Sequence, residues 1–288
     1  MKKIIRPMRT EFHILNLGAG VQSTFLYLQF LRGLITPQID AAIFADTQEE
    51  PAAVYSHLQW LISLKGPKIF IRTVGKLGDD LVHGRNSTGQ RFTAIPAFTT
   101  DGDTVGITRR QCSKEYKTEV IGQAIRRDIL NLSPGQPVPR GIVVHQYFGI
   151  SLNESGRAAR ISARRHPKYL HFHFPLVERF IVRSQCEVWL RTVVPHEVPR
   201  SACVFCPFHS DAEWEKIKAV PQDWRRAVEV DAALRTTGSC ANRDKRQTMY
   251  VHRSCRPLPL VKLEPKTDPR ANQSNINFAP ECLGVCGL

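Results

Sequence analysis

The sequence predicts an α/β fold, namely a Rossmann-like, doubly wound, mostly parallel sheet followed by a cysteine-containing C-terminal helical and extended region. Two observations carry this prediction. Short apolar runs typical of buried strands alternate with helical patterns through the first half of the 288 residues. A glycine-containing turn also separates the first apolar run from the first helical pattern. This β-α-β-α-β order implies neighbouring parallel strands that are joined by crossover helices.

The first half contains three expected strands and two expected helices. The strands are Phe12–Leu17, Ala41–Ala45 and Ile69–Val74, and the helices are Thr24–Leu34 and Pro51–Leu64. Phe25, Leu28 and Leu31 fall on one side of the first helix, as a helix packed on a sheet requires. Pro51 suits the first turn of the second helix, where its missing N–H costs nothing.

The remaining elements are less regular. Leu77–Ile107 is rich in Gly, Thr and Asp and has little periodicity, so we expect a long loop that could close over a site. Later expectations are helices over Thr118–Leu130, Gln185–Val193, Asp211–Lys218 and Asp223–Arg235, a strand over Gly141–Gly149 and an extended tail from Leu263. We expect a nucleotide-binding α/β domain over residues 10–200 and a cysteine-rich region over 201–288.

The charge balance points to a polyanionic partner. Forty Lys and Arg against 26 Asp and Glu give a net charge of +14, which favours nucleic acid or a phosphorylated substrate. The alternative is a generally basic, solvated surface. The excess is concentrated in one acid-free stretch, Gly156–Lys168, through Arg157, Arg160, Arg164, Arg165 and Lys168.

The eight cysteines are too few for a disulfide scaffold at this length. No apolar run reaches the roughly 18 residues of a membrane helix, and no signal peptide is evident. We therefore expect a cytoplasmic protein with reduced thiols and no membrane association. Clustered thiols in such a compartment suggest metal or sulfur chemistry.

The turn after the first strand has the features of a phosphate-binding loop. Gly18, Gly20, Ser23 and Thr24 lie between a strand and a helix. Glycines let backbone N–H groups approach a ligand closely, and the helix N-terminus adds positive potential. A plain strand–helix turn is the alternative. Asp46, directly after the second strand, supports a ligand site.

Leu17–Thr24 resembles the PP-loop of the adenine nucleotide alpha-hydrolase superfamily, and in particular the branch that contains phosphoadenylyl-sulfate (PAPS) reductase. Here Gly18 replaces a Ser, Ala19 a Gly and Gln22 an Asp of the usual pattern. Four further segments are similar to those of the family in the same order, and together the five cover about residues 12 to 210. They are Phe44–Glu50, Arg110–Lys117, Gly149–Arg157, and Pro175–Glu178 with Val188–Leu190.

The resemblance implies an adenine nucleotide-binding site for PAPS or ATP, with Mg²⁺ as a possible companion. Asp46 and Thr47 would lie beside the adenosine, and Arg110, Lys117 and Arg157 would contact the phosphate or sulfate end. The nucleotide phosphates would be held by Gly18, Ala19, Gly20, Gln22, Ser23 and Thr24. Arg offers bidentate donors to phosphate oxygens and Lys a point charge, so these residue types suit the role.

Cys203 and Cys206 form a C-x-x-C pair, whose thiolates can grip one metal atom. In the branch that reduces adenylyl-sulfate, the resembling segments carry an iron–sulfur cluster, and Cys112, Cys203 and Cys206 match three of its four ligand positions. The resemblance therefore implies a possible [4Fe–4S] cluster. Zinc, bound with His209 or another cysteine, is an alternative, and so are thiols without metal.

The C-terminal cysteines, Cys282 and Cys286, stand in a segment that resembles the tail carrying the nucleophilic cysteine of the reductases. A thiolate on a flexible tail can reach a site and attack sulfur. The same pair could instead dock on the body of the protein and bind metal. Both cysteines are therefore candidate catalytic residues and candidate metal ligands.

Three functions follow from these observations. The first is a PAPS reductase-like enzyme that performs thiol- or iron–sulfur-dependent sulfur chemistry with a thiol donor or sulfur carrier protein. The second is an ATP-dependent adenylating sulfurtransferase acting on tRNA or DNA, which the basic stretch favours. The third is a nucleotide-binding module without catalysis, which Gly18 and Gln22 favour.

Overall fold

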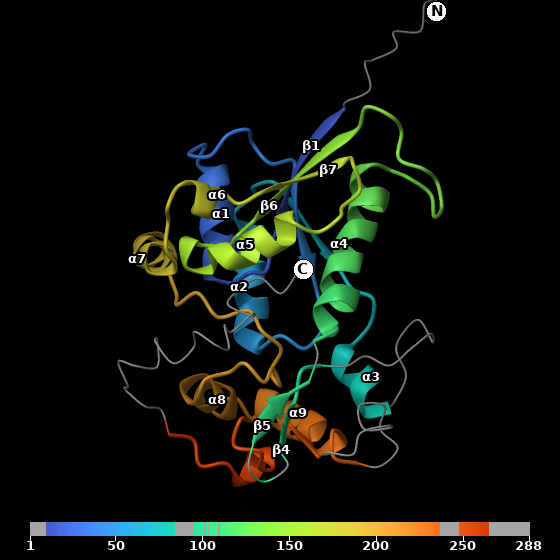
Figure 1. Ribbon diagram of the computed structural model, residues 1–288. Helices are drawn as coiled ribbons and strands as arrows, with labels where there is room; N and C mark the ends of the chain where they lie inside the picture. Colours follow the sequence, from blue (N-terminus) through green and yellow to red (C-terminus); the bar gives the residue numbers. More distant parts are fainter. Residues whose placement is uncertain are drawn as a thin grey trace, which may run out of the picture.

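The computed structural model describes residues 10–83, 95–100, 102, 104–108, 110–236 and 248–264. Its centre is a five-stranded sheet in which every neighbouring pair of strands is parallel, in the order β3-β2-β1-β6-β7 (Figure 1). The strands are β1 (Glu11–Asn16), β2 (Ala41–Ala45), β3 (Lys68–Arg72), β6 (Val143–Phe148) and β7 (Leu170–His173). The predicted α/β class with a parallel sheet is confirmed.

Helices cover both faces of the sheet. Alternate residues of its central strands are therefore buried on opposite sides. Leu15 and Phe44 pack with α1 (Val21–Leu31), α2 (Ala52–Ser63) and α7 (Arg183–Val193). Ile14 and Ile43 pack against the other layer. That layer is one helical run with π-helical ends, made of η1 (Lys114–Thr118), α4 (Glu119–Ala124) and η2 (Ile125–Ile129).

The order of the strands reverses between β1 and β6, because the chain moves outward from β1 to β3 and then returns to the other side of β1. In open parallel sheets, ligands bind beyond the carboxyl ends of the strands at such a reversal. Two loops meet there. One joins β1 to α1, and the other joins β6 to η3 (Leu152–Glu154) and α5 (Ser155–Ser162).

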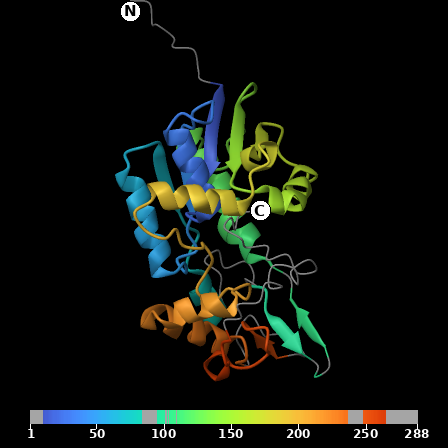
Figure 2. The same ribbon diagram turned by 90° about the vertical axis from the view of Figure 1, so that its left-hand side faces the viewer.

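A second hydrophobic core lies beyond this edge of the sheet (Figure 1; Figure 2). It joins α3 (Leu77–His83), α8 (Asp211–Lys218) and α9 (Pro221–Ala233), and Trp214 is buried at its centre. A small antiparallel sheet of order β5-β4-β8 completes it, with β4 (Phe98–Thr100), β5 (Val105–Ile107) and β8 (Met249–Tyr250). The domain boundary between residues 200 and 201 stays a prediction.

Most expected elements are present, with ends shifted by a few residues, and α8 has the predicted bounds. The expectation of a structureless loop over Leu77–Ile107 is wrong for its described part, which forms α3, β4 and β5. Leu77 and Leu81 lie one helical turn apart and are both buried in the second core, so tertiary packing holds a helix too short to be stable alone. Residues 84–94 and the tail from residue 265, with Cys282 and Cys286, lie outside the described residues.

Other short elements were not predicted either, among them β7 and α6 (Pro175–Glu178). β7 contains two histidines in four residues, and α6 is a single turn. No helix in the described part of the chain combines the length and apolarity needed to cross a bilayer.

Candidate nucleotide and sulfur site

The turn after β1 lies at the carboxyl edge of the sheet and leads into α1. Ala19 has a φ of 54°, in the left-handed region that favours glycine. Gly18 N donates to Ser23 Oγ at 3.1 Å, and Ser23 Oγ donates to the Gly20 carbonyl at 3.2 Å. Gly20 is the N-cap of the 11-residue helix α1, and no side chain caps it. The turn can therefore offer N–H groups and helix potential to an anion.

The loop after β6 packs directly on this turn. A Cβ at Gly149 would lie 2.7 Å from Ser23 N and 2.9 Å from the Gln22 carbonyl carbon, both backbone atoms. Only glycine permits that approach without a shift of the turn. The two loops at the strand reversal thus pack backbone against backbone.

A buried polar network joins the same two loops. Gln22, which is fully buried, donates through Nε2 to Ser151 Oγ at 3.0 Å and to Glu154 Oε2 at 2.5 Å. Arg157 pairs with Glu154 at 3.1 Å, and Arg183 donates to Gln22 Oε1 at 3.4 Å. Burial raises the pKa of Glu154, although Arg157 and Gln22 oppose the change. Gln22 and Arg157 therefore already have protein partners that hold them in place.

Thr24 faces α2 instead. Its hydroxyl lies 2.9 Å from His57 Nε2, and His57 Nδ1 lies 2.8 Å from His196 Nε2. Burial, followed by the neighbouring His196, lowers the pKa of His57 to about 4. His57 is thus neutral near pH 7, and through Thr24 it anchors the first turn of α1.

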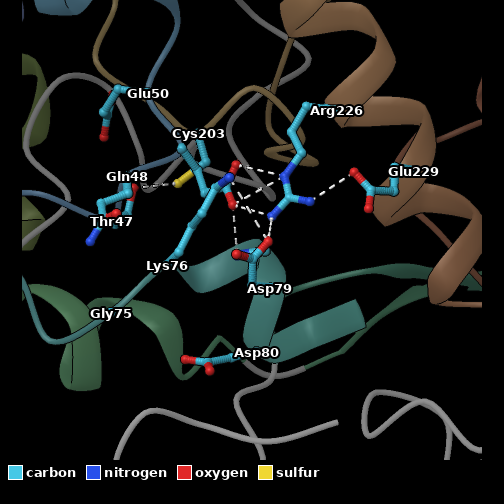
Figure 3. Close-up of polar contacts among 12 residues, drawn as sticks. Thr47, Gln48, Glu50, Gly75, Lys76, Asp79, Asp80, Cys203, Arg226 and Glu229 are labelled. Atoms are coloured by element: carbon cyan, nitrogen blue, oxygen red, sulfur yellow. Dashed lines mark hydrogen bonds and ion pairs between the residues drawn. The ribbon is translucent and has the colours of Figure 1, made fainter. Parts of the chain in front are cut away.

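The end of β2 supplies the next groups. Asp46 accepts hydrogen bonds from Gln48 N at 2.7 Å and from the Tyr55 hydroxyl at 2.9 Å. Thr47 is buried, and its hydroxyl lies 3.2 Å from Cys203 Sγ (Figure 3). This contact joins the segment after β2 to the C-x-x-C pair, and its two residues are 156 positions apart in the chain.

Lys117 occupies the space between the β1 turn and the cysteines. Its ammonium lies 3.1 Å from Glu50 Oε1, and both side chains are buried. Ser201 Oγ donates to the other oxygen of Glu50 at 3.1 Å. Lys117 lines a small cavity with Gly18, and it also lines the cavity that holds the cysteines. It is thus the one described cation that borders both.

The three cysteines expected to act together line a single cavity of about 30 Å³. Its polar lining consists of Thr47, Arg110, Cys112, Ser113, Lys117, Cys203 and Cys206. Cys112 precedes the helical run on one face of the sheet, whereas Cys203 and Cys206 belong to a turn before α8. Thiols and two cationic side chains are therefore neighbours at the carboxyl edge of the sheet.

The cysteine sulfurs are not packed around a single point. Among the described residues, one trio of His, Cys, Asp and Glu side chains places its ligand atoms within 4.8 Å of one another, and it contains no cysteine. Three thiolates on one zinc ion would lie roughly 3.8 Å apart, given a tetrahedral ion with Zn–S bonds of about 2.3 Å. This arrangement does not fit a zinc ion held by all three sulfurs. The donor set fits a cluster of several irons, although a cluster requires a wider cavity than this one.

A larger cavity of about 540 Å³ lies nearby, against the first residue of α1 and between α7 and α8. Its charges are balanced, because Arg183 pairs with Glu187, Arg200 with Glu213 and Lys216 with Glu197. His209 also lines it, and burial lowers the pKa of His209 to about 4. This cavity was not predictable from local sequence patterns, because its lining comes from four separate segments.

The structure thus gathers most of the predicted site residues at one edge of the sheet. They are Gly18, Ala19, Gly20, Gln22, Ser23, Asp46, Thr47, Arg110, Lys117, Arg157, Cys112, Cys203 and Cys206. Sequence reasoning missed Glu50, Ser151, Glu154, Arg183 and Ser201, which hold the predicted residues in place. Glu50 and Glu154 stood inside the quoted segments, so their position beside predicted ligands was the available signal.

Comparison of the chain with family models, with curated proteins and with solved structures gave no match.

Proposed function

We propose that the chain is a PP-loop enzyme of the adenine nucleotide alpha-hydrolase type, similar to PAPS reductases, and that it binds PAPS or ATP and performs sulfur chemistry. The observation that carries the proposal is the cavity that Cys112, Cys203 and Cys206 line together with Arg110 and Lys117. The two cationic side chains would attract an anionic substrate to the thiols.

The nucleotide would occupy the strand reversal. Its phosphates would accept hydrogen bonds from N–H groups at the start of α1, which no side chain caps, and Lys117 would contribute a charge. Neither Gln22 nor Arg157 is needed as a direct ligand, because each already holds the two loops together through Glu154. Asp46 and Thr47 would border the adenosine.

A [4Fe–4S] cluster would fit the donor set of Cys112, Cys203 and Cys206, with Cys282 or Cys286 as a fourth ligand. Such a cluster, when bound, would supply an electron-rich centre beside the nucleotide. The protein's own contribution is to hold the three thiols next to Lys117 and Arg110, with Cys206 buried and Cys112 and Cys203 partly exposed. If Cys282 or Cys286 does not bind the cluster, its thiolate is the candidate nucleophile.

The test is anaerobic purification of the full chain, followed by iron and acid-labile sulfide analysis. We expect about four irons per chain and broad visible absorbance, both lost in Cys203→Ser. Cys255→Ser is the matched control, because Cys255 is half-exposed and lies outside the cavity. A colourless protein with stoichiometric zinc would contradict the cluster.

Product analysis distinguishes the three functions. Thioredoxin-dependent release of sulfite from PAPS would identify the reductase. Conversion of ATP to AMP and pyrophosphate in the presence of nucleic acid would identify an adenylating enzyme. Nucleotide binding without turnover would leave a binding module.

The second candidate, an ATP-dependent sulfurtransferase acting on tRNA or DNA, is favoured by the surface next to the β6 loop. Arg160, Arg164 and Arg165 are exposed along and just after α5, and Lys168 follows them. Arg157 of the same run is buried and points inward to Glu154. An exposed basic strip therefore borders the proposed nucleotide site.

Its test is the salt dependence of nucleic acid binding. Replacing Arg160, Arg164 and Arg165 with Ala should reduce the slope of log affinity against log salt by roughly 2 to 3, since each phosphate contact contributes about 0.9. A control that removes the same charge from the exposed residues Lys65, Lys68 and Arg140 should leave the slope unchanged. Equal slopes in all three proteins would reject this strip as the binding surface.

A further inference from the structure

A ladder of histidines crosses three strands within the sheet, in the amino-terminal half of β1 and β6. In the register of the sheet, His13 of β1 lies beside His145 of β6, and His145 lies beside His171 of β7. The next pair along is Tyr147 with His173. Glu11 lies two residues before His13 and therefore on the same face. None of these groups belongs to the loops at the carboxyl edge of the sheet.

Glu11, His13 and His145 are the trio mentioned above, in which one ligand atom from each lies within 4.8 Å of the others. Glu11 is exposed, and the two histidines are half-buried. The imidazole rings of His13 and His145 are stacked with centroids 4.6 Å apart and an interplanar angle of 10°. The strands thus hold two imidazoles and one carboxylate together, with access to solvent on one side.

The Nδ1 atoms of both histidines already have hydrogen-bond partners. His13 Nδ1 lies 3.0 Å from the Tyr147 hydroxyl, and His145 Nδ1 lies 2.8 Å from His173 Nε2. A histidine that binds a metal uses its other ring N–H in this way, because the second hydrogen bond fixes the tautomer and the ring orientation. Nε2 of His13 and Nε2 of His145 are the nitrogens that would face a metal.

The backbone adds rigidity. His13 N donates to Asp40 Oδ2 at 2.8 Å, and Asp40 N donates to the His13 carbonyl at 2.7 Å. Both histidines lie in the central strand pair, where parallel hydrogen bonds hold the register. The ligands are therefore set by the sheet and not by a loop, which is the arrangement that preorganises a metal site.

We infer that Glu11, His13 and His145 bind one divalent transition-metal ion, with Zn²⁺ as the ion that the donor set suits best. Two imidazoles and one carboxylate are a frequent protein ligand set for zinc, with solvent in the fourth position. The same set can hold other divalent transition ions, because imidazole suits several of them. This site is separate from the cysteine cavity and does not depend on the proposed function.

Zinc binding to the metal-free full chain, measured by equilibrium dialysis and elemental analysis, tests this inference. The wild-type protein should bind one more tight zinc than either Glu11→Gln or His145→Gln. Glu11→Gln is the more informative variant, because an exposed glutamine keeps the shape and leaves folding intact. Tyr147→Phe should retain the site with affinity weakened by roughly 10-fold, since it removes only the partner of His13.

Two controls separate this zinc from any zinc held by cysteine. His166→Gln should bind as the wild type does, because His166 Nε2 contacts the Ile161 carbonyl and lies outside the trio. Cys203→Ser should retain the Glu11-dependent zinc. Equal zinc content and affinity in wild type, Glu11→Gln and His145→Gln would overturn the inference, and so would a wild-type protein that binds no zinc.

Discussion

Gly149 shows how one residue determines the shape of the candidate site. Its Cα lies so close to the β1–α1 turn that an added Cβ would lie 2.7 Å from Ser23 N. We expect Gly149→Ala to lower the free energy of unfolding by about 1 to 3 kcal/mol, as overpacking does, and to weaken nucleotide binding because the turn must shift.

Gly122→Ala is the matched control for that substitution. Gly122 lies inside α4, and a Cβ there would meet no atom within 4 Å. The variant should gain about 0.5 to 1 kcal/mol, because alanine favours the helix. Denaturant unfolding and nucleotide titration of both variants check the pair, and equal stabilities would contradict the close packing of the two loops.

His57 makes the stability of the folded protein depend on pH. Burial and His196 lower its pKa in the folded protein from 6.5 to about 4, so between these values the unfolded chain binds the extra proton. The contribution of His57 to the free energy of unfolding is fully present above pH 6.5. It is lost as the pH falls toward 4, by up to about 3 kcal/mol. Unfolding measured at pH 7.5, 5.5 and 4.5 should show a smaller decline in His57→Gln than in wild type; identical declines would reject the assignment.

The predictability of the site from sequence differs from residue to residue. The Gly18–Gly20 turn and the C-x-x-C pair were visible, because each is a local pattern between strong strand and helix signals. The partners of these residues were not visible. Gln22 meets Glu154 across 132 residues, and Thr47 meets Cys203 across 156 residues, and no local pattern encodes such contacts.

At the scale of elements, Glu49 connects three parts of the chain. Its carboxylate accepts from Gly78 N at the start of α3 and from Arg226 of α9, while its own carbonyl accepts from Val204 N. Glu49 is buried, and Arg226 has 16% of its side chain exposed. This network fixes the C-x-x-C turn against the end of β2.

Removal of that carboxylate should therefore be costly. Glu49→Ala is expected to destabilise the protein by about 3 kcal/mol, because Arg226 and Gly78 N lose a buried partner. Glu229→Ala removes a half-exposed partner of the same Arg226, and it should cost less than about 1 kcal/mol. Thermal and denaturant unfolding of both variants checks the difference, and a similar loss in each would contradict the role given to Glu49.

Local sequence patterns predicted the longer, buried helices and strands and missed the short ones. The helices around residues 211–218 and 221–233 were visible from apolar spacing. β7 was missed because its four residues include two histidines, and α3, β4 and β5 were missed because short elements depend on a core built from distant residues. The fold class needed only the order of the strong elements.

At the scale of the whole molecule, the two ends of the parallel sheet have different chemistry. The carboxyl edge joins a glycine turn, Lys117 and three cysteines, and the opposite half of the same sheet carries the histidine ladder. The net charge is +14, and three of the exposed cationic side chains lie beside the carboxyl edge: Arg160, Arg164 and Arg165. Under the proposed function, this edge would attract an anionic nucleotide, with or without nucleic acid.

Hydrogen–deuterium exchange of the full chain, with and without saturating PAPS or ATP, tests the central claim most directly. The account predicts slower exchange over residues 17–24, 46–50, 110–117 and 149–157, since these segments meet at the strand reversal. Unchanged exchange with both nucleotides, or protection confined to the segments 183–200 and 209–217 around the larger cavity, would contradict it.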